Sequence, residues 1–212
     1  MKSFPFNRDE FTKIAKLLGI VAPKNLGDVI YKYRFRKDLP EEISNTAATD
    51  FEWTIKLAGT GNYRFELSKV NRIIPNPNLI KIKIPDSTPE IIAKYALTDE
   101  QALLAKVRYN RLIDIFLGIT TYSLQNHLRT TVQDIGQIEI DEIYVGVNRN
   151  GTHFVIPVQA KGGKDKLGVV QTQQDIACCT EKFSELICRP VSAQFMEDNL
   201  IAMFELALDE DE

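Results

Sequence analysis

Three polar residues in the second half of the chain have the types needed for chemistry on a phosphate: Asp141, Gln159 and Lys161. A carboxylate and an amide oxygen are hard ligands that suit Mg²⁺, and the backbone carbonyl of Ala160 offers a third oxygen. A bound metal lowers the pKa of a water and stabilises charge on a phosphate. A lysine beside it can hold the attacking water and counter the developing negative charge. We therefore predict a metal site made by Asp141, Gln159 and Ala160, with Lys161 as a catalytic group.

A β-hairpin is the element that we expect to bring these residues together. Residues 136–147 and 154–163 are β-rich, and Arg149-Asn150-Gly151 between them fits a three-residue loop with a left-handed glycine. Antiparallel pairing across that loop sets Asp141 opposite Gln159, with their Cβ atoms ~5 Å apart. Gln159 and Lys161 then share one face of the strand, and the apolar residues between them take the other. The spacing alone also permits an ordinary cross-strand ion pair between Asp141 and Lys161.

The order of these residues resembles a known family. An acid at the end of Gly-x-x-Glu-Ile-Asp, a hairpin, and then Gln-x-Lys after a β-run are similar to the PD-(D/E)XK nuclease superfamily, which includes restriction endonucleases. The resemblance aligns Asp141 with the family's aspartate, Gln159 with its second acid and Lys161 with its lysine. Residues 99–104 and 122–129 also look like restriction-endonuclease-like proteins. What the resemblance implies is a nuclease core over roughly residues 108–205.

One departure from the family pattern changes the expected metal chemistry. Gln159 replaces the usual acid and removes one negative charge, so we expect weaker binding of a single Mg²⁺ or Mn²⁺ ion. For the family's upstream position we take Gln125 as a catalytic candidate, with Glu100 second. Glu139, on the strand face of Asp141, is a further potential ligand, although a surface role suits it better.

The expected fold class is α/β (α+β): a restriction-endonuclease-like core with a mixed central sheet flanked by helices, and an N-terminal winged-helix-like region. Prolines punctuate residues 72–90, so we divide the chain into residues 1–90 and 91–212. In the first part we expect helices around residues 11–18 and 25–33 and a hairpin over 51–67. In the second part the apolar spacing predicts a long helix from residue 99, which Gly118 would end, and a further helix over 122–132.

Double-stranded DNA is the partner that this interpretation implies. The run Tyr31–Lys37 interleaves aromatic residues with cations, so we name Arg34 and Arg36 as DNA contacts. We also expect Lys164 and Lys166, which follow the predicted site, to lie along a DNA strand. The alternative in both places is an ordinary solvated helix end. Since two strands must be cut, we expect a homodimer.

Composition bounds the class of protein without choosing the function. The sequence is 44% hydrophobic and 26% charged, as in ordinary globular proteins, and the net charge of −3 neither indicates nor excludes DNA binding. The three cysteines lack the spacing of a disulfide framework or zinc site, and no run approaches the ~18 apolar residues of a membrane span. We expect a cytoplasmic, metal-dependent DNA endonuclease of the type II restriction kind. The alternatives are a non-catalytic DNA-binding protein with a degenerate nuclease fold, or a nuclease-like subunit of a larger complex.

Overall fold

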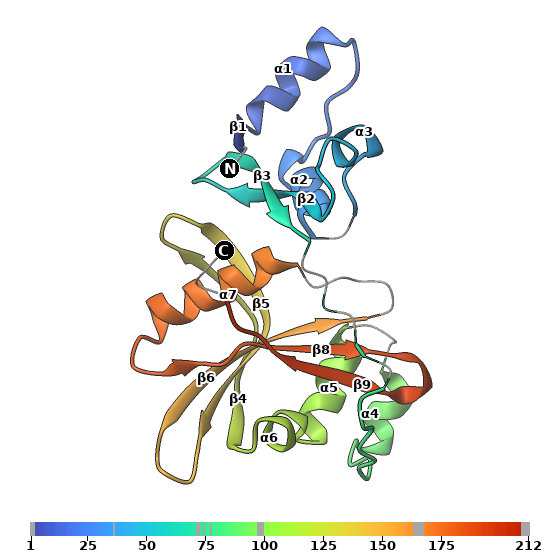
Figure 1. The fold of residues 1–212 in the computed structure, drawn as a ribbon, viewed down its shortest axis with the longest axis vertical. Coiled ribbons are helices and arrows are strands. Elements are labelled where there is room, and N and C mark those ends of the chain that lie inside the picture. The colour runs from blue at the N-terminus through green and yellow to red at the C-terminus, as the bar shows by residue number, and fades with distance from the viewer. Residues whose placement is uncertain are drawn as a thin grey trace. The chain divides into compact units, whose positions relative to one another are not determined.

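The computed structural model describes residues 3–35, 37–70, 73, 75–76, 78–96, 100–162 and 168–208. The chain forms two compact units (Figure 1). The first comprises residues 1–72, 131–137 and 168–170, and the second comprises 73–130, 138–167 and 171–212. Within the described residues, no helix is long and apolar enough to cross a membrane. The assignment of separate tasks to residues 1–90 and 91–212 stays a prediction.

The first unit combines short helices with a small antiparallel sheet in the order β1-β3-β2. Its elements are β1 (Ser3–Asn7), α1 (Asp9–Leu17), α2 (Leu26–Phe35), α3 (Glu41–Ser44), β2 (Phe51–Leu57) and β3 (Asn62–Lys69). The two predicted helices and the predicted hairpin are confirmed. Sequence reasoning did not foresee β1, whose Pro5 is tolerated because β1 is an edge strand. A small core of Ile30, Ile55 and Tyr63 holds α2 on the sheet.

The second unit is a mixed sheet with helices on both faces, as the coarse fold prediction states. Its helices are α4 (Glu90–Tyr95), α5 (Glu100–Tyr109), α6 (Leu112–Leu117), α7 (Val169–Lys182) and the 3-10 turn η1 (Glu197–Asn199). Its strands are β4 (Thr120–Val132), β5 (Gly136–Val147), β6 (His153–Lys161), β7 (Ile187–Cys188), β8 (Val191–Phe195) and β9 (Ile201–Glu205). They are ordered β4-β5-β6-β8-β9, with β7 beside β6. The sheet is mixed because β6 pairs antiparallel with β5 and parallel with β8.

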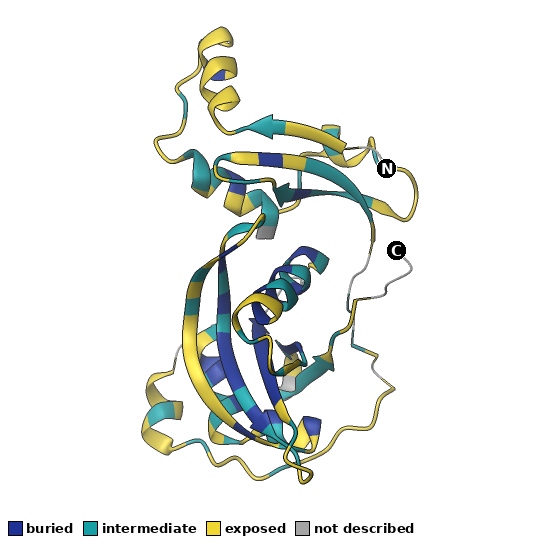
Figure 2. Cartoon of the chain, turned by 90° about the vertical axis from the view of Figure 1, so that its left-hand side faces the viewer, coloured by how far each residue is buried: buried dark blue, intermediate teal, exposed yellow. Residues whose placement is uncertain are grey.

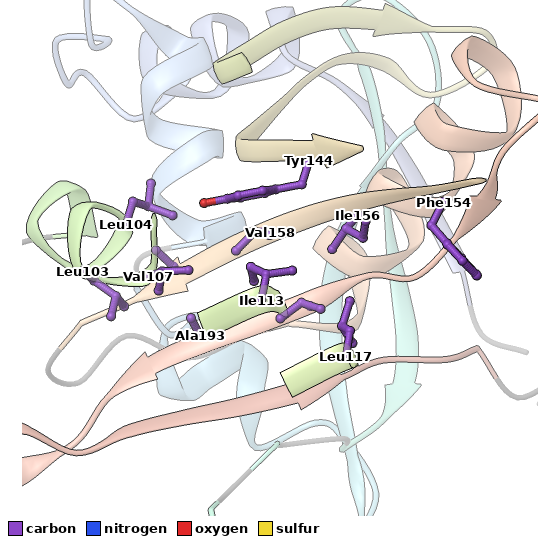
Figure 3. Packing of buried hydrophobic residues seen from close by; sticks show 12 residues of the cluster. Leu103, Leu104, Val107, Ile113, Leu117, Tyr144, Phe154, Ile156, Val158 and Ala193 are labelled. Atoms are coloured by element: carbon purple, nitrogen blue, oxygen red, sulfur yellow. The ribbon is translucent and has the colours of Figure 1, made fainter. Parts of the chain in front are cut away.

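Strand β6 is buried on both faces, which explains its nearly continuous apolar sequence. On one face Ile156 and Val158 pack with Leu104 and Val107 of α5 and Ile113 of α6 (Figure 3). On the other face β5 and β6 pack against Cys179 of α7 and its neighbours. The edge strand β4 is instead exposed along most of its length (Figure 2). Polar residues in β6 therefore lie between two layers of helix.

The helix expected over residues 122–132 is wrong: this segment is strand β4. Its apolar residues are spaced by two and four positions, which fits the two-residue period of a strand as well as a helical turn. Threonines and a tyrosine at its ends favour the strand. His127 has a positive φ of 48° in the middle of β4 and interrupts its regular extended conformation.

The long helix expected from residue 99 is two helices, α5 and α6. Arg111 adopts a left-handed conformation with φ 50° between them, and the side chain of Asn110 binds the carbonyl of Lys106 at 3.0 Å. The continuous apolar spacing conceals this turn because α5 and α6 contribute to the same core. As predicted, Gly118 ends the helical stretch, with a φ of 67°.

Candidate functional site

The predicted hairpin and its register are present in the structure. The β5–β6 pairing runs from Val147 opposite His153 to Glu142 opposite Val158. The three-residue loop of Arg149, Asn150 and Gly151 closes it, with a φ of 80° at the glycine. Asp141 and Gln159 are the next residues along the two strands after the last pair. Local turn chemistry therefore sets the register that brings them together.

The backbone ladder gives way to a side-chain contact at Asp141. Its Oδ2 accepts a hydrogen bond from the Ala160 N–H at 2.9 Å. The regular ladder would direct this N–H to the carbonyl of Ile140. The N–H and C=O of a strand residue point to the same side, so the carbonyl of Ala160 also faces the Asp141 side. The end of the pairing thus gathers a carboxylate and a carbonyl.

Asp141 is a carboxylate whose surroundings favour the neutral form. Burial raises its pKa above the ordinary value. The Ala160 hydrogen bond and the charge of Lys161 act in the opposite direction, and they do not outweigh burial. A cation placed beside Asp141 would favour its ionised form, and a carboxylate whose pKa is raised in this way is typical of functional sites.

Lys161 lies at the end of β6 and is only 8% exposed. Its Nζ is 4.0 Å from a carboxylate oxygen of Glu100, the first residue of α5. Glu100 was the second choice for the upstream acid, and here it is near the site lysine. The contact joins the start of α5 to the strand end that carries Gln159.

Gln159 is 2% exposed and is held by α7. Its Nε2 lies 3.1 and 3.0 Å from the two carboxylate oxygens of Asp175. Its Oε1 is 3.5 Å from Nε2 of Gln171, one helical turn before Asp175. Both ends of the Gln159 amide therefore face side chains of α7.

Sequence reasoning missed Asp175, which is the most deeply buried acid near the predicted site, at 3% exposure. Burial raises its pKa well above the ordinary value, and the charge of Asp141 adds to this effect. The Gln159 hydrogen bond and Lys161 lower the pKa only in part. A signal was available: Asp175 stands between buried residues of an amphipathic helix, where an acid without a task is rare.

Two other candidates lie outside this cluster. Gln125 is exposed on β4, not on a helix, and none of the contacts described for Asp141, Gln159 or Lys161 involves it. Glu139 contacts His127 and Arg129, with Oε1 3.1 Å from His127 Nδ1. Burial alone would raise the pKa of Glu139, but hydrogen bonds from Arg129 and His127 lower it overall. These contacts suit a surface ion cluster.

The predicted DNA contacts receive little support. The guanidinium of Arg34 turns inward, with Nε 3.0 Å from the Ile55 carbonyl, and burial lowers the pKa of Arg34 to about 10. This contact ties α2 to β2, and the DNA contact named for Arg34 stays a prediction. Arg36, Lys164 and Lys166 lie outside the described residues.

A second polar cluster lies on the opposite face of the sheet, around Glu142. This residue is fully buried, and its Oε1 accepts hydrogen bonds from Nε of Arg108 at 2.9 Å and from the Ser123 hydroxyl. The Glu142 carboxylate raises the pKa of Arg108 above its ordinary value. Asp141 and Glu142 are neighbours in sequence, and strand alternation sends them to different helices.

The first cluster contains three oxygen donors of the kind that a hard cation binds. Asp141 supplies a carboxylate, Ala160 a carbonyl on the same side, and Gln159 an amide oxygen, all of the type that Mg²⁺ binds. Among the described residues there is no group of three or more His, Cys, Asp or Glu side chains able to hold a metal. A bound Mg²⁺ would therefore need water and substrate oxygen to complete its shell, as is common for this ion.

Comparison with known proteins adds no further assignment: no family model, curated protein or solved structure matches the chain.

Proposed function

We propose that this protein is a metal-dependent DNA endonuclease of the PD-(D/E)XK type, most simply a type II restriction endonuclease. The single observation that carries the proposal is the convergence of Asp141, Gln159 and Lys161 at the end of one hairpin. Asp141 bonds the backbone between the other two residues, at the Ala160 N–H. A buried carboxylate and ammonium are costly to keep together without a task.

The side chains divide the work of phosphodiester hydrolysis. Asp141, Gln159 and the Ala160 carbonyl would hold Mg²⁺, which supplies an acidified water and positive charge when bound. Lys161 holds the attacking water and balances the negative charge that builds on the phosphate. Glu100, 4.0 Å from Lys161, positions that ammonium group. The apolar layers on both sides of β6 keep bulk water from the strand interior.

The decisive experiment is plasmid cleavage by the purified chain. With Mg²⁺ or Mn²⁺ we expect nicked and then linear DNA, and with EDTA we expect neither. The matched variants are Asp141→Asn and Glu185→Gln, because Glu185 is an exposed acid in the turn after α7 and is not part of the proposed metal site. Cleavage by the second variant and not by the first supports the proposal. Equal cleavage by both variants would exclude Asp141 from the site.

A second function, DNA binding without cleavage, is favoured by one observation. The residue at the second acidic position is an amide whose Nε2 faces Asp175 rather than a metal site. In that case the purified protein binds duplex DNA with an unchanged affinity in EDTA and in Mg²⁺, and no cleavage product forms.

The first unit is proposed as the winged-helix-like DNA grip. Its three helices and three-stranded sheet support this, and Lys32 and Lys37 are exposed near the end of α2. Replacing both with alanine should flatten the salt dependence of DNA binding by up to about two in log–log slope. Replacing Lys13 and Lys16 of α1 is the matched control and should leave the slope unchanged. We further expect a homodimer, which light scattering on the purified chain would measure.

A further inference from the structure

In the contact between Gln159 and Asp175, the amide nitrogen of Gln159 is the donor and the Asp175 carboxylate is the acceptor. An ionised carboxylate only accepts hydrogen bonds, so ionised Asp175, with both oxygens within 3.1 Å, selects the Nε2 end of the Gln159 amide. The Oε1 end of the amide must then point away from Asp175. Nε2 of Gln171 lies 3.5 Å from this oxygen. Without Asp175, the two ends of the amide would be interchangeable. The helix therefore selects one of the two amide orientations.

We propose that Asp175 is a positioning residue that fixes the orientation of the Gln159 amide, with the carbonyl oxygen on the side away from Asp175, and makes an amide the required side chain at position 159. This inference rests on the proposed function, in which that oxygen is a metal ligand. The second carboxylate of the site is then Asp175 on helix α7, in place of an acid at position 159 on strand β6. Asp175 acts through Gln159.

Charge explains why a glutamate at position 159 is incompatible with Asp175. Its carboxylate would lie where the Gln159 amide now lies, about 3 Å from Asp175, with both residues at most 3% exposed. Two like charges at that distance in a poorly solvated place repel strongly. With an amide at 159 the same contact becomes a charge-assisted hydrogen bond. The Gln159–Asp175 pair then carries a single negative charge. Nearby, Lys161 contributes a positive charge and Asp141 a negative one.

The repulsion can be measured without DNA or metal. We would record thermal unfolding in EDTA for the wild type, Gln159→Glu, Asp175→Asn and the double variant. Gln159→Glu should lower Tm by about 10 °C, as expected for an uncompensated buried charge in a chain of this size. The double variant, with one carboxylate and one amide exchanged, should recover most of that loss. A double variant no more stable than Gln159→Glu overturns the inference.

Gln174 provides a matched control because it is a buried glutamine of the same helix, 8% exposed. Gln174→Glu measures the general cost of burying a glutamate in this region. Adjacent side chains of a helix do not face each other, so adding Asp175→Asn to Gln174→Glu should rescue stability much less than it does in the Gln159→Glu background. Equal rescue in both backgrounds would show that Asp175→Asn stabilises the fold without any specific coupling to position 159, and would overturn the inference.

Metal affinity tests the positioning role directly. Asp175→Asn offers both a donor and an acceptor, so it no longer selects one orientation of Gln159. Mn²⁺ binding, followed by electron paramagnetic resonance, should weaken about 10-fold or more, as for other residues that orient metal ligands. Unchanged affinity in a folded variant would refute the positioning role. If wild-type protein cuts no DNA but the charge coupling is present, the proposed function fails and the Gln159–Asp175 pairing stands.

Discussion

Asp141 and Glu142 are consecutive acids on β5, and the structure treats them in opposite ways. Glu142 is fully buried and bonded to Arg108 and Ser123. Asp141 is partly buried, and its hydrogen bond comes from a backbone N–H. Burial raises the pKa of Asp141, which means that its contacts do not fully compensate the charge. Glu142 therefore has a guanidinium and a hydroxyl as partners within the fold, whereas Asp141 has a backbone N–H, and this is the contrast on which the proposed metal site builds.

The difference separates stability from function on one strand. A buried acid with a cation partner contributes to a specific fold, and losing that partner is costly. An acid whose pKa is raised by burial is maintained at some expense of stability, which is typical of active sites. The comparison therefore predicts that Asp141→Asn affects catalysis, whereas Glu142→Gln affects folding.

The largest expected effect is on cleavage by Asp141→Asn. Losing the principal metal ligand removes several kcal/mol of transition-state stabilisation, which lowers the cleavage rate by about 1,000-fold or more. DNA affinity and Tm should stay close to wild type because no ion pair of the core is broken. Rates of plasmid nicking at saturating enzyme, together with circular dichroism melts, check both parts. A variant that melts early instead would assign Asp141 the structural role.

Glu142→Gln should produce the opposite pattern. Arg108 loses its buried partner, and the free energy of unfolding should fall by about 2–3 kcal/mol in urea titrations. We place the loss below the ~3–5 kcal/mol seen for fully buried pairs because the Arg108 side chain is 36% exposed and can be solvated in part. Below the melting transition, the folded fraction should cut DNA at the wild-type rate. A stable but inactive variant would contradict the comparison.

Asp175→Asn should change the pH dependence of stability. The pKa of Asp175 is raised in the folded protein by burial, so the native state holds its proton more tightly than the unfolded chain does. Wild-type stability from this group is therefore fully present below the ordinary aspartate pKa and is lost as pH rises through the folded pKa. The asparagine variant lacks that loss. Its Tm should exceed that of wild type at neutral pH, and the two should converge near pH 4 in melts without metal. A wild type that remains more stable at neutral pH would show that the Asp175 carboxylate is fully compensated.

The hairpin could be predicted from sequence because local chemistry determines it. Gly151 permits the left-handed turn, and the turn length sets Asp141 beside Gln159. Strand β4 was mistaken for a helix because apolar residues at even spacings fit both periods. The break at Arg111 was hidden because both helices that it separates face one core. These errors concern elements whose identity depends on tertiary packing.

The site could be predicted only where the chain itself brings residues together. Asp175 is 16 residues from Gln159, and only the packing of α7 on the sheet puts them in contact. Glu100 reaches Lys161 for the same reason, through the start of α5. Gln125 was chosen from its position on an expected helix, so the loss of that helix removed the basis for the choice. Short-range pairing was accessible from sequence, and helix-to-sheet contacts were not.

Glu139 provides the smallest and most discriminating test, because it shares the strand face of Asp141 and was a candidate ligand. Its side chain is 29% exposed and contacts Arg129 and His127. Ion pairs at this exposure are worth roughly 0.2–1 kcal/mol, so Glu139→Gln should shift Tm by only a few degrees. Cleavage should change by no more than a few-fold, because the carboxylate is already engaged by Arg129 and His127.

The same variant also shows how far the site extends along β5. If Glu139 binds the metal, Glu139→Gln should weaken Mn²⁺ binding and slow cleavage nearly as much as Asp141→Asn does. If it only lowers the potential around Asp141, its removal should lower the pKa of Asp141, because the Glu139 charge is one of the influences that raise it. The pH profile of cleavage should then move slightly toward acid with little change in the maximum rate. An unmoved profile together with a large loss of rate would place Glu139 among the ligands and enlarge the site beyond Asp141.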